Sequence, residues 1–192
     1  MNKTEDILEQ PIEKTGVDKN QLASELSQEE VLRMFLAAAN YKEDESLYMP
    51  ITIKRGGKKL LPTFRIRPLS QDEIHTAHVK ATQYLPNPAG RRLPKIEGET
   101  NDSLERSWTI YFATVDEDRK ALWDNPYYQK ALQAQHPEVV FSQGNAGAQM
   151  IHMLLNAGEK SSLVAKIIEI SFPDDVIEED DQGPDEEEFA KN

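Results

Sequence analysis

The chain has 192 residues, of which 38% are hydrophobic and 29% charged, enough for one domain with a hydrophobic core and flexible ends. Asp and Glu outnumber Lys and Arg by 34 to 22, for a formal net charge of -12. The absence of cysteine excludes disulfides, thiolate nucleophiles and cysteine-type zinc sites, and fits a reducing cytoplasm. Neither a signal peptide nor a run of 18 apolar residues is present, so we expect an unexported chain without membrane contact.

The negative charge is concentrated at the two ends of the chain. Residues 1–30 hold eight acidic and three basic residues, and residues 173–192 hold ten acidic residues and one basic residue. Like charges repel, and these ends have too few apolar side chains to offset the conformational entropy lost on folding. We therefore predict a flexible acidic arm over residues 1–26, a single globular domain over residues 27–172 and a disordered acidic tail over residues 173–192.

Two capping boxes, each a Ser followed three residues later by a Glu, indicate helix starts. Ser27 and Glu30 precede an apolar pattern that predicts a helix over residues 28–40. Ser70 and Glu73 predict the start of a second helix. The residues that share one face of this second helical pattern are Ile74, Ala77, His78, Ala81 and Leu85.

Apolar residues alternate with a period of two on both sides of Gly56 and Gly57. Two alternating runs separated by glycines predict a β-hairpin. The alternating positions are Ile51, Ile53, Phe64 and Ile66. The second strand of this hairpin leads through a tight turn into the helix that starts at Ser70.

The segment of residues 86–101 contains three prolines and two glycines without an apolar period, which predicts a loop. After it, Asp102 and Glu105 stand at capping-box spacing before a helix with a broad aromatic face. Asn125 and Pro126 suit the cap and the first position of the next helix. The residues of the aromatic face are Leu104, Trp108, Tyr111, Phe112 and Val115.

The stretch "NAGEKSS" has the residue types of a phosphate-binding loop in the wrong order. Such a loop requires Lys directly after its second Gly, and Glu159 separates Gly158 from Lys160. We therefore predict a hinge between helices over residues 146–156 and 159–170. In this interpretation Gly158 caps the first helix and Glu159 suits the start of the second.

No other enzyme or metal signature is found. His75 and His78 are three residues apart on a predicted helix, but nothing in the sequence supplies a third ligand. The nucleophile elbow G-x-S-x-G is absent. We interpret the two histidines as surface or half-buried residues, and predict no catalytic, cofactor-binding or metal-ligating residue.

Ten basic residues lie between Lys54 and Lys95, against only Asp72 and Glu73. They could contact nucleic-acid phosphates, protect strand edges from pairing, or attract an acidic segment such as the chain's own tail. Few aromatic residues lie among them and the whole chain is acidic, so nucleic acid is the least favoured of the three.

The last two predicted helices carry more apolar residues than one packing partner requires. Methionine side chains adapt to varied surfaces, so part of this face could bind a partner's helix or a second copy of the chain. The residues that we predict to contact a partner are Met150, Met153, Leu154, Leu163 and Ile167.

Three segments, within about residues 50–172, resemble the tail assembly chaperones of long-tailed bacteriophages and prophages of Gram-positive bacteria. They are "FRIRPLSQDEI", "SWTIYFATVD" and "LLNAGEKSSLVAKIIEIS". The resemblance implies a non-enzymatic protein of the host cytoplasm that binds and solubilises the tape measure protein and helps to recruit tail tube protein. The alternatives are a structural virion component, such as a connector or tail completion protein, and a nucleic-acid-binding accessory protein.

We predict a mainly helical α+β fold, with a hairpin packed on four or five short helices.

Overall fold

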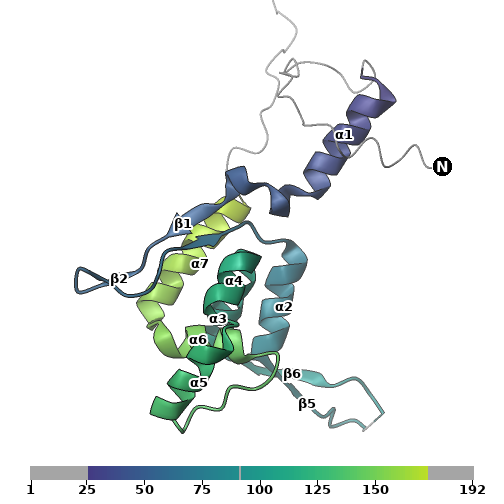
Figure 1. Cartoon of the computed structure of the whole chain (residues 1–192). Coiled ribbons are helices and arrows are strands. Elements are labelled where there is room, and N and C mark those ends of the chain that lie inside the picture. The colour runs from purple at the N-terminus through teal and green to yellow at the C-terminus, as the bar shows by residue number, and fades with distance from the viewer. Residues whose placement is uncertain (1–25, 91, 173–192) are drawn as a thin grey trace, which may run out of the picture. The chain divides into compact units, whose positions relative to one another are not determined.

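The computed structural model describes residues 26–90 and 92–172, which form seven α-helices and three two-stranded antiparallel ribbons (Figure 1). The fold is α+β and mainly α, as predicted. Apart from residue 26, the predicted acidic arm and the predicted tail lie outside the described residues. In chain order the elements are α1 Gln28–Ala39, η2 Tyr41–Glu43, η3 Glu45–Leu47, β1 Met49–Ile51, β2 Lys54–Arg55, β3 Lys58–Lys59, β4 Phe64–Ile66, α2 Gln71–Ala81, β5 Thr82–Leu85, β6 Ile96–Thr100, α3 Asp102–Ala113, α4 Asp116–Leu122, α5 Pro126–Gln135, α6 Ala146–Leu154 and α7 Ala157–Ser171.

The chain divides into two compact units between Tyr41 and Lys42. The first unit contains α1, whose capping box is formed as predicted. Ser27 Oγ accepts from the Glu30 backbone N–H at 3.3 Å, and Glu30 Oε2 accepts from the Ser27 backbone N–H at 2.8 Å. No residue of α1 is buried.

The predicted hairpin opens the second unit. β1 pairs with β4 in the register Ile51 to Phe64, and β2 pairs with β3 around a turn at Gly56 and Gly57. Both glycines have positive φ, 59° and 78°, which a two-residue hairpin turn requires and other residues rarely adopt. The four alternating apolar residues of the prediction are all buried, so the hairpin presents its apolar face to the core.

The core of the second unit forms where this face meets α3, α6 and α7. At its centre the rings of Phe64 and Trp123 pack edge to face, 5.5 Å between centroids. The indole N–H of Trp123 donates to Thr114 Oγ1 at 3.0 Å, so this buried polar group is satisfied. The chain can therefore bury both side chains completely.

A smaller cluster lies between α2, α3 and α6 around Trp108. Trp108 stacks on Phe112 at 5.4 Å, and the ammonium of Lys80 lies 4.4 Å from its ring. Gly147 lets α6 approach α3 closely, because an added Cβ would overlap the ring of Tyr111.

The prediction of a loop over residues 86–101 is wrong for part of its length. α2 ends at Ala81, and β5 then pairs with β6 in a ribbon that projects from the helices (Figure 1). Leu85 therefore lies on a strand rather than on the helix face. β-branched threonines favour the strand, and the hydroxyls of Thr82 and Thr100 are hydrogen-bonded at 2.8 Å across it.

Two predicted helix caps, at Asp102 and Gly158, are also wrong. In both cases an asparagine side chain caps the start of the helix instead. Asn101 Oδ1, not Asp102, accepts from the Leu104 backbone N–H at 2.9 Å. Asn156 caps α7 and forms a capping box with Glu159, so Gly158 lies inside the first turn of α7. The predicted hinge between two helices is present at residues 155–156.

Candidate partner-binding groove

An uncharged groove of about 400 Å³ lies between α5, α6, the end of α4 and the segment after β3. Its polar lining groups are the amide of Gln135 and the phenol hydroxyl of Tyr128, and the other lining side chains are apolar. Pockets that bind small molecules typically span about 300–1,000 Å³, so this groove has room for a few side chains. Its lining residues are Leu61, Pro62, Leu122, Tyr128, Ala131, Leu132, Gln135, Met150 and Leu154.

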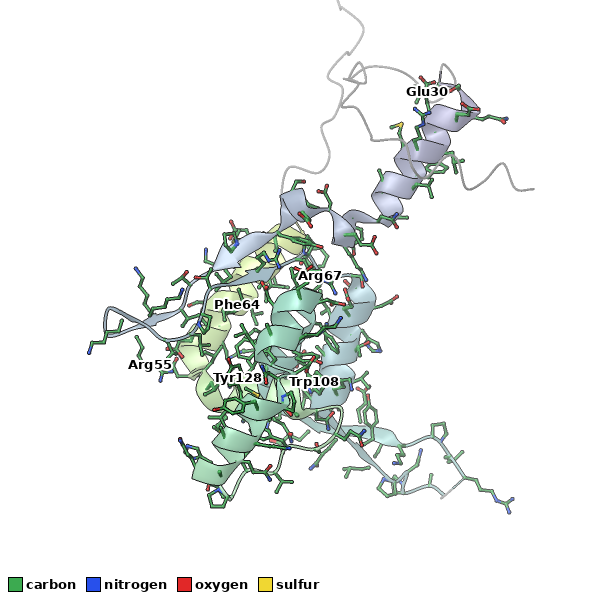
Figure 2. All side chains as sticks on the ribbon, viewed as in Figure 1. Glu30, Arg55, Phe64, Arg67, Trp108 and Tyr128 are labelled. Atoms are coloured by element: carbon green, nitrogen blue, oxygen red, sulfur yellow. The ribbon has the colours of Figure 1, made fainter. Side chains whose placement is uncertain are left out.

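One wall of the groove is α5, which starts as predicted. Asn125 Oδ1 accepts from the Tyr127 backbone N–H at 3.0 Å, and Pro126 occupies the first helical position. The amide of Gln129 donates to the carbonyl of Trp123 at 2.8 Å and holds the helix against the core. Nevertheless no residue of α5 is buried, and Tyr128 is 44% exposed beside the groove (Figure 2). Its apolar face is thus only partly covered by this chain.

The opposite wall is α6, which contributes two of the five residues predicted to contact a partner. Met150, 3% exposed, and the half-buried Leu154 both line the groove. Met153 is half-buried and lies outside the lining. Leu163 and Ile167 are core residues that pack inside the second unit, so neither is available at its surface.

The contribution of α5 to the groove was not predicted from the sequence. Tyr128, Leu132 and Gln135 follow the spacing i, i+4, i+7 that places side chains on one helical face. That spacing was readable in the sequence. The short helix carries only a few apolar residues, whereas the longer apolar runs of α6 and α7 gave a stronger signal.

Arg55 on the hairpin contacts the Leu154 end of the groove. Arg55 Nη2 donates to the carbonyl of Leu154 at 3.1 Å and to Glu159 Oε2 at 2.7 Å, which fixes the hairpin beside the start of α7 (Figure 2). Lys54, Lys58 and Lys59 on this hairpin are exposed.

Arg65 and Arg67, also in the basic segment, form ion pairs within the chain. Arg65 donates to Glu117 at 2.8 Å and to Asp118 at 3.0 Å, and its hydrogen bond to Asp118 lowers the pKa of that carboxyl. Arg67 donates to Glu73 at 2.8 Å. These guanidiniums are engaged within the chain, which leaves the lysines as the accessible charges of the hairpin.

Glu73 is the carboxylate whose pKa departs most from its ordinary value. Burial acts to raise that pKa, but hydrogen bonds from Arg67, the Ser70 backbone and Lys42 outweigh it and lower the pKa to about 2. The group therefore stays ionised and ties α2 to the segment before β1.

The two predicted surface histidines behave differently. His75 is exposed, and His78 Nδ1 lies 3.2 Å from Glu105 Oε1. Over residues 26–90 and 92–172 no three His, Asp or Glu side chains are placed to hold a metal ion together.

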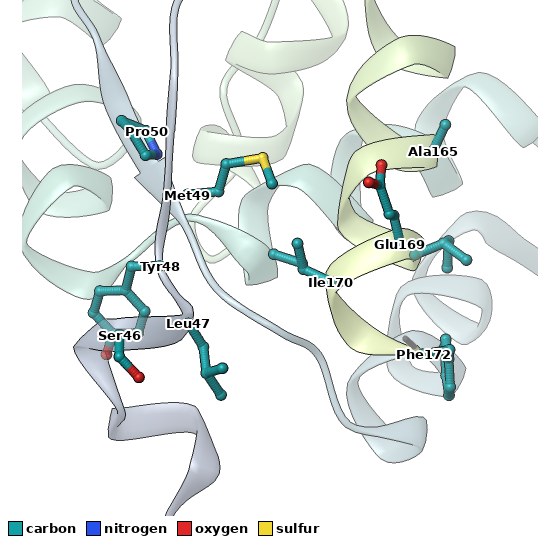
Figure 3. Close-up of a pocket in the computed structure, with 10 residues that line it drawn as sticks. Ser46, Leu47, Tyr48, Met49, Pro50, Ala165, Glu169, Ile170 and Phe172 are labelled. Atoms are coloured by element: carbon teal, nitrogen blue, oxygen red, sulfur yellow. The ribbon is translucent and has the colours of Figure 1, made fainter. Parts of the chain in front are cut away.

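A second groove, of about 850 Å³, lies between residues 46–50 and the C-terminal half of α7 (Figure 3). Met49 extends from β1 toward α7, while Ser46 and Glu169 make the lining partly polar. Phe172, the last residue that the structure describes, also lines it. The groove at α5 is the better candidate for an apolar partner, because its lining carries no charge.

Among the described helices none combines the length and the apolar character needed to cross a bilayer. No protein-family model, no curated protein and no solved structure matches the chain significantly.

Proposed function

We propose that this chain is a tail assembly chaperone that binds an apolar helix of the tape measure protein in the groove between α5 and α6, and so keeps that protein soluble. A role in recruiting tail tube protein belongs to the same proposal. The observation that carries it is the uncharged groove beside a helix, α5, that buries none of its own residues.

The chemistry of the groove favours a helix as its occupant. Tyr128, Leu132 and Gln135 present one helical face, and an amphipathic helix fits such a groove through side chains spaced three and four residues apart. Methionine at position 150 adapts its shape to different side chains, which suits a chaperone that meets many similar segments of a long partner.

The expected affinity is modest. Burying a large apolar side chain contributes roughly 1.5–3 kcal/mol, and a groove of this volume receives only a few of them. Part of that gain is offset by the loss of translational and rotational freedom on association. Repeated weak contacts along the partner would therefore cover it while remaining releasable when tube subunits polymerise.

The engagement of Arg55, Arg65 and Arg67 within the chain disfavours the alternative of a nucleic-acid-binding protein. The alternative of a structural virion component predicts a protein that stays in purified particles, whereas a chaperone is displaced.

The proposal is tested by producing the tape measure protein of the same phage with and without this chain. We expect the tape measure protein to be soluble, and recovered in a complex, only when this chain is present. Unchanged solubility without a recovered complex would contradict the proposal.

A further inference from the structure

Lys160 on α7 is a buried cation without a buried counter-ion. Its residue is 3% exposed, and its ammonium donates to Ser103 Oγ at 2.5 Å. Burial, together with the positive charge of Arg106, lowers the pKa of Lys160. Burying a charge costs free energy unless an opposite charge compensates it, so a bound anion would stabilise the ammonium of Lys160.

Arg106 extends the same positive cluster to the surface. One of its five N–H donors binds Ser161 Oγ at 3.2 Å, and the rest have no partner within residues 26–90 and 92–172. Ser161 also donates to the carbonyl of Ala157 at 2.9 Å, which fixes it as an acceptor for the guanidinium. Arg106 is thereby held beside α7 with most of its donors free.

The hydroxyl proton of Ser103 is available as well. Because Ser103 Oγ accepts from Lys160, its own proton is left for an acceptor: either His152 Nδ1, 3.4 Å away, or an incoming oxyanion. The site thus offers a guanidinium, a hydroxyl polarised by a buried ammonium and the positive end of α3, at whose start Ser103 lies.

Two carboxylates next to this cluster in the sequence are engaged elsewhere, and a third, Asp102, is exposed beside Ser103 in the first turn of α3. Both oxygens of Glu159 bind Arg55, at 2.9 and 2.7 Å, and Glu105 faces His78 at 3.2 Å. Within the part of the chain that the structure describes, no acidic side chain forms an ion pair with Arg106 or Lys160.

We propose that Arg106, Ser103 and Lys160 form a binding site for carboxylates of the chain's own acidic segment, residues 178–188. That segment carries eight of the ten acidic residues that follow residue 172. Charge complementarity favours it over neutral partners, and covalent attachment holds it at a local concentration in the millimolar range.

The length of the chain permits this contact. Lys160 lies about 18 Å along α7 from Phe172, at a rise of about 1.5 Å per residue. Six residues of extended chain span about 20 Å, so the carboxylates from Glu178 onward reach the cluster while Asp174 and Asp175 fall short. Lys166, which is exposed, lies between Lys160 and Phe172 in the sequence of α7.

The test compares backbone amide NMR shifts of the full-length chain with those of a variant in which all eight acidic residues of 178–188 are changed to Asn or Gln. We expect the largest changes at residues 103–106 and 158–162, and expect 0.5 M NaCl to reproduce them because exposed ion pairs are screened. In an Arg106→Gln background the same neutralisation should give changes at least fivefold smaller, whereas Lys166→Gln should leave them intact.

A second variant, with the six acidic residues of 1–25 neutralised, controls for general loss of charge and should leave these amides unmoved. Three results would overturn the proposal. They are unmoved amides in the tail variant, equal changes in the Arg106→Gln background, and changes produced only by the amino-terminal variant. Inorganic phosphate, added to the wild-type chain, distinguishes a site for free oxyanions: saturable shifts there without any effect of tail neutralisation would also overturn it.

Discussion

Arg55 and Glu159, 104 positions apart in the chain, are joined by two hydrogen bonds, from Nε to Oε1 at 2.9 Å and from Nη2 to Oε2 at 2.7 Å. Glu159 also accepts from the backbone N–H of Asn156 at 2.9 Å, as part of the capping box of α7. One carboxylate thus connects the hairpin, the start of α7 and, through Arg55 and Leu154, the end of the groove.

Arg55→Lys keeps the charge but loses the planar fork that binds both carboxylate oxygens. We expect amide hydrogen exchange in the hairpin, at Leu60 above all, to become faster while the Tm changes little, because the ion pair is exposed. Lys58→Gln, on the same hairpin, is the control and should not change exchange. Unaltered protection in Arg55→Lys would contradict this role of the ion pair.

Gly147→Ala should destabilise the second unit. The added Cβ would overlap the ring of Tyr111 and lie 2.8 Å from Asp124 Oδ1, so α6 or Tyr111 must shift. Overpacking of this kind costs about 1–3 kcal/mol, measurable by urea denaturation.

Gly158→Ala is the matched control for that substitution. Gly158 is also helical, and its added Cβ would meet nothing closer than 3.5 Å, so the same change should stabilise the chain by about 0.5–1 kcal/mol. Equal effects of the two substitutions would contradict the inference that position 147 is Gly because α6 packs closely on α3.

The ionised Glu73 makes stability depend on pH. Its pKa is about 2 in the folded chain and about 4.5 ordinarily, so its contribution is fully present above about pH 4.5 and is lost as the pH falls toward 2. We expect about 2–3 kcal/mol from this group, less than the full shift implies because its side chain is 23% exposed.

Glu73→Gln should remove this pH dependence while keeping the capping box, which accepts either residue. Asp72→Asn, in the same helical turn, should leave the dependence in place. The measurement is urea denaturation at several pH values between 2 and 7. A Glu73→Gln variant with the wild-type slope below pH 4.5 would contradict the assignment.

Local signals predicted the local structure well. The capping boxes at Ser27 and Ser70, the Gly56–Gly57 turn and the proline at the start of α5 are all formed, because each depends on neighbours within a few residues. The β5–β6 ribbon was missed because its strands pair across a proline-rich connection, and a helical apolar pattern continues through Leu85.

The candidate site was harder to predict than the fold. A buried side chain such as Ile167 and a groove-lining one such as Leu154 look alike in a sequence, since both satisfy the same helical spacing. What separates them is the packing of distant elements: the hairpin covers one part of α6 and α7 and leaves the part beside α5 open.

The most direct test of the partner-binding groove compares two glutamate substitutions on α5. Ala131 lines the groove and Ala134, also exposed on the same helix, does not. The two variants have the same charge and the same helix propensity, so they should fold equally well; circular dichroism and Tm check this.

The measurement is the affinity of each variant for the tape measure protein, in co-purification and titration. Ala131→Glu should weaken binding at least tenfold, because a carboxylate would be buried in an uncharged groove, whereas Ala134→Glu should stay within twofold of wild type. Equal affinity of Ala131→Glu, Ala134→Glu and the wild type would contradict the account.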